Sequence, residues 1–381
     1  MKQMSRILSV LMIAALLLSG CNAGPCTHEW NPTDGTCKLC GEGCSHNWNA
    51  ETGFCRTCYY QCRHPGEIPA DTACGICGKV ATFETLTTTD VVGYETTFVR
   101  IPDMWTGHCE QSGKIERLDY TTDAYGDGVT YDRFVRVYVP YGYDPNDTST
   151  KYNVIYFQHG NTGSQNTMTN SKMVRLFDNI FARSDIEKCI IVCPTYYLSQ
   201  DQTKAGDGWD GGEFLYYKEI IEDVIPLVES HYNTYTETFD EAGLKASREH
   251  RAFTGYSRGS ACTWNMFTHA LEYFKWFSPM SCNFMGADHT AGIDNEQAFQ
   301  LLKAAIDAHP ELDFFIYAAS GGPEDATFMR TQMRDFLQHT EVFSFGTDPA
   351  VNNIYYSIAD YPHSDEYVPY FYYNSLQVFF R

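Results

Sequence analysis

The chain has 381 residues, of which 43% are hydrophobic and 15% aromatic, so it can bury the core of a large domain. Its formal net charge of −21 at pH 7 would repel a phosphate backbone, and we therefore do not expect nucleic acid as a partner. Neutral or weakly charged substrates, including polysaccharides, are compatible with this charge.

The N-terminus has the pattern of an export signal. Lys2 and Arg6 precede an apolar run that is too short to span a bilayer, and the run ends in Leu18-Ser19-Gly20-Cys21. This resembles a bacterial lipoprotein signal, with residues 1–20 removed and Cys21 lipidated as the first mature residue. The alternative is an ordinary cleaved signal followed by a coincidental cysteine. Both interpretations predict export, and the first predicts a cell-surface protein that contacts the membrane through its lipid anchor alone.

Residues 21–80 contain three copies of a Cys-x-His and Cys-x-x-Cys pattern with a period of eighteen residues, which slips by one residue in the third copy. Each copy offers three cysteines and one histidine, a complete tetrahedral ligand set for structural zinc. Segments this short cannot bury a core, so a metal would supply the missing stabilisation. The candidate ligands are Cys26, His28, Cys37 and Cys40 in the first copy, Cys44, His46, Cys55 and Cys58 in the second, and Cys62, His64, Cys74 and Cys77 in the third.

Disulfides are the competing interpretation, because an exported chain meets oxidising conditions. The nine cysteines of the repeats would leave one unpaired, however, and disulfides give no reason for a histidine that recurs in step. The ligand count therefore favours zinc, and the copies look like the small zinc-ribbon-like repeats of some bacterial surface lipoproteins. What the repeats contact is not indicated.

After a threonine-rich segment at residues 81–108, interpreted as a linker with a first edge strand, the pattern of the chain changes. From residue 109 to 381, apolar strand-like runs alternate with helical ones, which predicts a mostly parallel sheet with helices on both faces. In such a fold, ligands bind at the carboxyl ends of the strands. The predicted strands are residues 115–121, 133–140, 153–158, 188–194, the run ending at 256, 276–281, 312–319 and 352–358, and the predicted helices are 168–182, 214–231, 261–274, 296–309, 327–339 and 366–380.

The stretch around Gly255-x-Ser257-x-Gly259 follows a predicted strand and opens a predicted helix. A serine at so tight a turn needs neighbours almost free of side chains, so that strand and helix can pack closely. The following helix points its N-terminal amides at the oxygen where negative charge develops in acyl transfer. Ser257 is therefore the candidate nucleophile.

A serine hydroxyl requires a base to take its proton and an acid to orient that base. In the α/β-hydrolase order both follow the serine, the acid first. His363 comes after the final predicted strand and is the candidate base. Asp325 comes after the preceding strand and is the candidate acid, with its neighbour Glu324 and the more distant Asp288 as competitors.

The oxyanion hole needs two backbone N–H donors. We expect one from Arg258, directly after the nucleophile, and one from Asn161, in the loop that follows the strand at residues 153–158. Trp209, in a glycine-rich loop, is a candidate to stack on a sugar or phenolic ring of the substrate. No cofactor is expected for catalysis.

Together with Val137-Tyr-Val-Pro-Tyr-Gly-Tyr143, His159-Gly160 and Phe277-Ser-Pro-Met-Ser281, these motifs resemble carbohydrate esterase family 1, which contains feruloyl and acetylxylan esterases and is related to esterase D. The resemblance implies an α/β-hydrolase fold, a triad of Ser257, Asp325 and His363, and ester substrates on plant cell-wall polysaccharide. Arg258 and Ser260 depart from the common family pattern. The alternatives are a catalytically silent binding lipoprotein and an acyltransferase on the same fold.

Overall fold

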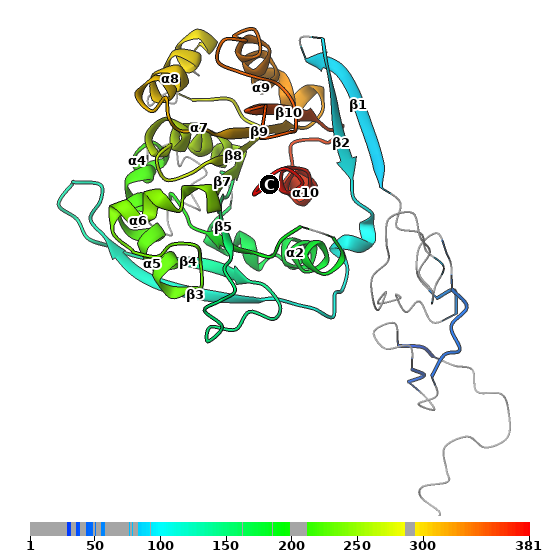
Figure 1. Ribbon diagram of the computed structural model, residues 1–381. Helices are drawn as coiled ribbons and strands as arrows, with labels where there is room; N and C mark the ends of the chain where they lie inside the picture. The colour runs from blue at the N-terminus through cyan, green and yellow to red at the C-terminus, as the bar shows by residue number, and fades with distance from the viewer. Residues whose placement is uncertain are drawn as a thin grey trace, which may run out of the picture. The chain divides into compact units, whose positions relative to one another are not determined.

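The computed structural model describes residues 29–31, 36–38, 43–48, 50, 55–57, 76, 78, 83–91, 93–161, 163–184, 186–198, 212–285 and 294–381. The chain divides into two compact units, Met1–Thr82 and Phe83–Arg381. The first contains the repeats, and the second contains the predicted enzyme domain (Figure 1). Within the described residues, no helix has the length and apolar character that crossing a membrane requires.

The larger unit is built on an eight-stranded sheet in the order β10-β9-β8-β7-β5-β6-β4-β3. The strands β5 to β10 run parallel to one another, whereas β3 and β4 are antiparallel additions at the edge next to β6. This confirms the predicted α/β-hydrolase type of sheet. The strands are β3 (Lys114–Thr122), β4 (Tyr131–Val139), β5 (Asn153–Gln158), β6 (Cys189–Cys193), β7 (Arg251–Tyr256), β8 (Trp276–Met280), β9 (Phe315–Ser320) and β10 (Ile354–Ile358).

Helices cover both faces of the sheet, and every residue of β5, β6, β7, β8 and β9 is consequently buried (Figure 1). In the view of Figure 1, α2 and α10 lie on one side of the central strands, and α4 to α8 lie on the other. The helices are α2 (Ser171–Arg183), α4 (Gly212–Glu219), α5 (Ile225–His231), α6 (Glu241–Ala246), α7 (Arg258–Ala270), α8 (Asn295–Ala308), α9 (Pro323–Phe336) and α10 (Val368–Leu376). Single turns of 3-10 helix form at Asp103–Thr106, Gln165–Thr169, Arg248–His250 and Asp365–Tyr367.

Where the sequence predicted a linker with a first edge strand, the structure has a hairpin of β1 (Glu84–Val91) and β2 (Tyr94–Arg100). It belongs to the larger unit, which begins at Phe83 rather than at residue 109. Asn374 of α10 accepts from the Val99 amide at 2.8 Å and donates to the Val99 carbonyl at 2.8 Å, and Thr97 donates its amide to the Tyr355 hydroxyl at 2.6 Å. The threonine-rich composition indicated a strand but gave no sign of these partners, which lie more than 250 residues further along the chain.

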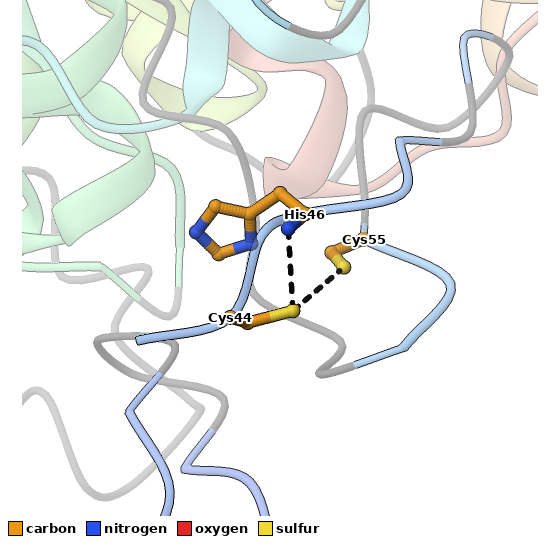
Figure 2. A group of neighbouring side chains, drawn as sticks. All are labelled: Cys44, His46 and Cys55. Atoms are coloured by element: carbon orange, nitrogen blue, oxygen red, sulfur yellow. Dashed lines mark hydrogen bonds between the residues drawn. The ribbon is translucent and has the colours of Figure 1, made fainter. Parts of the chain in front are cut away.

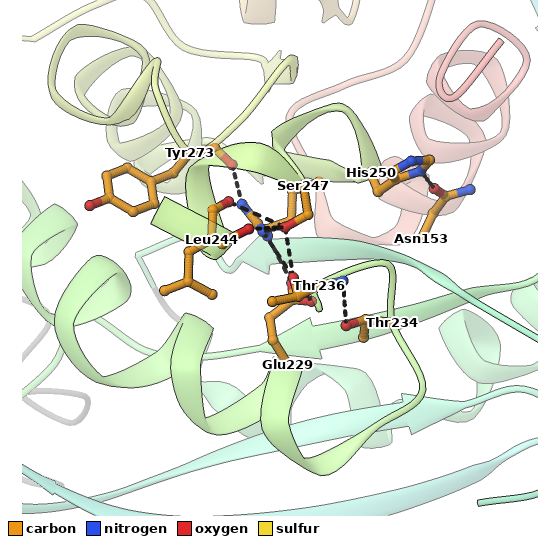
Figure 3. Close-up of polar contacts among 10 residues, drawn as sticks. Asn153, Glu229, Thr234, Thr236, Leu244, Ser247, His250 and Tyr273 are labelled. Carbon is orange, nitrogen blue, oxygen red and sulfur yellow. Dashed lines mark hydrogen bonds and ion pairs between the residues drawn. The ribbon is translucent and has the colours of Figure 1, made fainter. Parts of the chain in front are cut away.

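The strand that carries the elbow is anchored at its first residue by a buried ion pair with Glu229, which is labelled in Figure 3. Arg251 donates from Nε to Glu229 at 2.8 Å and from Nη1 to the Tyr273 carbonyl at 2.6 Å. Thr236 donates to the second carboxylate oxygen of Glu229 at 2.9 Å, and Ser247 accepts from Arg251. Buried charges are tolerated only when paired and hydrogen-bonded in this way. The network fixes the start of β7 against α5 and against Ser247, which precedes β7.

Candidate active site

Ser257 lies at a strained turn between β7 and α7. Its backbone angles are φ 56° and ψ −122°, a conformation that L-residues other than glycine rarely adopt. The Ser257 amide donates to the Met280 carbonyl of β8 at 2.8 Å, and the Ser257 carbonyl accepts from the Ser260 amide at 2.8 Å as α7 begins. The predicted nucleophile elbow is therefore present, held by the neighbouring strand and by the first turn of its helix.

The two glycines of the motif are required sterically. A Cβ on Gly255 would lie 2.2 Å from the carbonyl oxygen of Gly259, and a Cβ on Gly259 would lie 2.1 Å from the carbonyl oxygen of Gln158. Such contacts are far closer than any real Cβ makes. The pattern Gly-x-Ser-x-Gly thus allows β7, α7 and the end of β5 to approach within backbone contact, which presents Ser257 at the carboxyl edge of the sheet.

His363 lies in the loop after β10, and its Nε2 is 2.9 Å from the Oγ of Ser257. The imidazole also stacks on the ring of Tyr256, with centroids 4.9 Å apart and planes inclined by 27°. The side chain is exposed, so protons can exchange with solvent. Two residues separated by 106 positions in sequence are thereby placed at the distance that proton transfer requires.

The candidate acid falls partly outside the described structure. The backbone of Asp325 lies in the first turn of α9, because Pro323 begins that helix four residues before the predicted start; its side chain, like that of Glu324, is not among those described. Asp288 lies outside the described residues. The backbone nevertheless brings the two loops together, because the Gly322 amide donates to the Tyr361 carbonyl at 2.8 Å. Asp325 lies three residues after Gly322, and His363 lies two residues after Tyr361.

Asp365, two residues after His363, is a further carboxyl group near the imidazole. Burial raises the pKa of Asp365 above its usual range, and the nearby His363 opposes that rise. It also lines a cavity of about 270 Å³ at the carboxyl end of β5, together with Gly160 and Tyr256. A Cβ on Gly160 would lie 3.3 Å from the Cβ of Ser257, so this cavity adjoins the candidate nucleophile.

The two predicted oxyanion donors belong to segments that contact each other through side chains. Arg258 is buried, and its Nη1 donates to Oδ1 of Asn161 at 3.2 Å. Its guanidinium lies over the ring of Tyr196 at 4.9 Å, and the Tyr197 hydroxyl donates to the Asn161 carbonyl. The arginine that departs from the family pattern therefore ties the loop after β5 to the start of α7. It fixes the spacing of the two amides that we expect to bind an oxyanion.

A second buried ion pair holds the segment after β6 that carries Tyr196 and Tyr197. Arg133 of β4 donates from Nε to Glu219 at 2.9 Å, and its other nitrogens donate to the carbonyls of Thr195 and Tyr197. Glu219 ends α4 at a π-helical turn, Ile220–Val224. The sequence analysis missed this pair, although a signal existed: Arg133 has the same parity as Val135, Val137 and Val139 and therefore points into the core.

His159, at the start of the same loop, is buried and neutral. Its Nε2 lies 2.7 Å from the Thr195 hydroxyl and its Nδ1 lies 2.7 Å from the Gly160 carbonyl, which can only accept. Nδ1 therefore carries the proton, and Nε2 accepts from Thr195. Burial lowers the pKa of His159 to about 4. His159 is thus a structural support of the Gly160–Asn161 turn.

The remaining predicted residues are only partly described. In the second repeat the structure brings Cys44, His46 and Cys55 together, and it also describes Cys37 of the first repeat. The other candidate ligands, namely Cys26, His28, Cys40, Cys58, Cys62, His64, Cys74 and Cys77, lie outside the described residues, as do Trp209 and the candidate lipidation site Cys21.

A mostly parallel sheet with a serine at a strained strand-to-helix turn, and a histidine 2.9 Å from its hydroxyl, defines the class of serine hydrolases with an α/β-hydrolase fold. Residues 129–371 match the family described as "Putative esterase". The chain belongs to this esterase family, and it is a carboxylic ester hydrolase.

Comparison with individual proteins agrees with this assignment. The chain is 29% identical to the feruloyl esterase module of Clostridium thermocellum, solved as a serine-to-alanine mutant with sinapinate, with a TM-score of 0.63 over 74% of this chain and 94% of the module. A ferulic acid esterase of Anaeromyces mucronatus, 16% identical with a TM-score of 0.52, covers 73% of this chain and 96% of its own length, and shares the fold. Endo-1,4-beta-xylanase Y of Acetivibrio thermocellus is 29% identical over 283 residues, which are 74% of this chain but only 24% of that protein.

Proposed function

We propose that the protein hydrolyses feruloyl esters on plant cell-wall xylan through a serine-bound acyl-enzyme. The single observation that carries the proposal is the 2.9 Å contact between Ser257 Oγ and His363 Nε2 beside a cavity at the carboxyl ends of the central strands. The likeness to a feruloyl esterase module supports the aromatic acyl group, and the likeness to a xylanase supports the polysaccharide. The acetyl ester is the alternative acyl group.

The proposed reaction begins at the contact between Ser257 and His363. Ser257 Oγ attacks the ester carbonyl carbon while His363 Nε2 takes the hydroxyl proton. The amides of Arg258 and Asn161 donate to the oxyanion, and Asp325 holds the imidazolium. Collapse of the tetrahedral intermediate expels the sugar alcohol, which receives the proton from His363. Water then attacks the acyl-serine by the same route and releases the free acid.

We further propose that the protein acts outside the cell, anchored through a lipid on Cys21. The basic start, the short apolar run and the cysteine that follows it support this location. Mass spectrometry of the membrane-extracted protein would test it, because diacylation predicts a mature N-terminal peptide that begins at Cys21 with added acyl chains. An unmodified peptide beginning elsewhere contradicts lipid anchoring.

The decisive substrate experiment measures ferulate and acetate released from one arabinoxylan that carries both esters, with the Ser257→Ala variant as control. The proposal predicts that ferulate is released faster than acetate and that the variant releases neither. Preferential acetate release would overturn the feruloyl assignment while leaving the esterase in place. Absence of turnover on every ester would favour a silent binding protein, and product that forms only with an added sugar acceptor would indicate an acyltransferase.

A further inference from the structure

The first two repeats share one backbone design within the described residues. Trp30 pairs with Cys37 in an antiparallel bridge, and Trp48 pairs with Cys55 in the same way, eighteen residues later. The flanking hydrogen bonds keep the same period: the Lys38 amide donates to the Glu29 carbonyl at 2.8 Å, and the Arg56 amide donates to the Asn47 carbonyl at 2.7 Å. Each bridge thus places a cysteine opposite a tryptophan, and Cys37 and Cys55 are both buried. A short hairpin without a core of its own needs another source of stability.

In the second repeat, three soft donor groups converge. One ligand atom each from Cys44, His46 and Cys55 lies within 4.8 Å of the other two (Figure 2). The two sulfurs are 3.7 Å apart. A disulfide would require about 2.05 Å. Two thiolates on one tetrahedral zinc ion, each about 2.3 Å from the metal, would be about 3.8 Å apart. The observed separation excludes a disulfide in this structure and matches that of two thiolates on one tetrahedral zinc ion.

Backbone amides donate to both sulfurs. The His46 amide donates to Sγ of Cys44 at 3.3 Å, and the Thr57 amide donates to Sγ of Cys55 at 3.4 Å. In both cases the donor lies two residues after the cysteine. The ring of Trp48 stacks on the imidazole of His46, with centroids 4.6 Å apart. Amide donors to sulfur and a packed imidazole orient the ligands and supply the partial positive charge that a metal-bound thiolate attracts.

We propose that Cys44, His46 and Cys55 bind a thiophilic divalent cation, Zn²⁺, that stabilises the repeat and takes no part in ester hydrolysis. The cysteine thiols release their protons to solvent when they bind, and the imidazole binds through a neutral nitrogen. Four ligands complete such a structural site. Cys44, His46 and Cys55 supply three of them within the described residues.

The test measures the zinc content of the full chain purified from zinc-supplemented cells. A variant with both Cys44→Ser and Cys55→Ser should contain one zinc ion fewer per chain than the unaltered protein. Cys282→Ser is the matched control, because Cys282 lies in the larger unit and its substitution should leave zinc content unchanged. Equal zinc content in the double variant and the unaltered protein would overturn the proposal. A Cys44–Cys55 disulfide in the unreduced, unaltered protein would overturn it as well.

A second measurement separates structure from catalysis and does not depend on folding of the variant. Chelator treatment of the unaltered chain should expose Cys44 and Cys55 to alkylation and speed proteolysis within residues 29–57, while turnover of an aryl ester stays unchanged. Alkylation at the same rate with and without chelator would refute metal binding. Loss of ester turnover on chelation, restored by Zn²⁺, would refute the claim that the metal is remote from the chemistry.

Discussion

Substitution of Gly259 by alanine tests the geometry of the elbow most finely. The added methyl group would lie 2.1 Å from the carbonyl oxygen of Gln158 and 2.8 Å from that of His159. Because carbon atoms do not approach carbonyl oxygen closer than about 3 Å, α7 and the end of β5 must separate by about 0.9 Å. These two segments carry the candidate oxyanion donors Arg258 and Asn161, so the substitution widens the spacing between them.

A displacement of about 1 Å at reacting groups costs roughly 10²-fold in rate, or about 2.7 kcal/mol. We therefore expect Gly259→Ala to lower kcat/KM on an activated aryl ester about 100-fold, with most of the loss in kcat. The overpacking itself should also destabilise the fold by about 1–3 kcal/mol. Activity is accordingly measured per folded molecule, at a temperature well below the melting transition of the variant.

Gly243→Ala is the matched control. Its methyl group would lie 2.1 Å from the carbonyl oxygen of Thr238, the same clash within α6 and its preceding turn, away from the active-site loops. This variant should lose stability to a similar extent and retain kcat/KM per folded molecule. The reasoning is refuted if Gly259→Ala retains full kcat/KM, or if Gly243→Ala loses as much activity as Gly259→Ala.

Three further predictions follow from the buried and titrating groups. Arg251→Leu leaves a buried carboxylate without its cation and should lower the free energy of unfolding by about 3–5 kcal/mol in urea titrations. Lys303→Ala removes a surface ion pair and should change the free energy of unfolding by less than about 1 kcal/mol. Equal effects of the two substitutions would contradict the proposed role of Arg251 at the start of β7. Burial holds the pKa of His159 at about 4, so between pH 6.5 and 4 the unfolded chain binds more protons at this residue than the folded chain does. The free energy of unfolding therefore decreases by roughly 3 kcal/mol from this group as the pH falls through that range. His159→Gln should flatten the pH dependence of Tm between pH 6.5 and 4, and an unaltered slope would contradict the buried, neutral state of His159. Asp325→Asn should lower kcat by about 10²-fold to 10⁴-fold while Glu324→Gln stays near the unaltered rate, and the reverse result would transfer the role of acid to Glu324.

The sequence predicted those parts of the fold that local pattern determines. The alternation of apolar runs predicted the order and type of the central strands, and β5 has the boundaries expected from its composition alone. The helix ends were less accurate. The α9 helix starts at Pro323 rather than at residue 327, because proline is well suited to a first helical turn and the glycines before it already leave the strand. Capping of this kind depends on backbone geometry that hydrophobic periodicity does not report.

The candidate site was predictable where motif and topology coincide. Ser257 was identified by the glycines that its turn requires, and His363 by its position after the last strand, and the structure places the two side chains 2.9 Å apart. The side-chain contacts that support the site were not predicted, because they join residues far apart in the sequence. Arg258 reaches across the oxyanion loop to Asn161, and Arg133 reaches the carbonyls behind it. Only the parity of Arg133 within its strand indicated a buried charge.

The hairpin β1–β2 also shows that local sequence does not predict long-range contacts. Its threonines indicated a strand, but its place in the larger unit depends on Asn374 and Tyr355, whose side chains pair with its backbone. Strand composition reflects a fit to a pleated, half-buried surface, and it therefore says little about which distant residues the hairpin contacts.

The most direct test of the central claim is the turnover of an activated aryl ester by Ser257→Ala, compared with the unaltered chain and corrected for the uncatalysed rate. Removal of the hydroxyl that His363 contacts at 2.9 Å should lower kcat by about 10⁴-fold or more, with the variant still folded. Turnover within about tenfold of the unaltered protein would show that ester cleavage takes place without this serine.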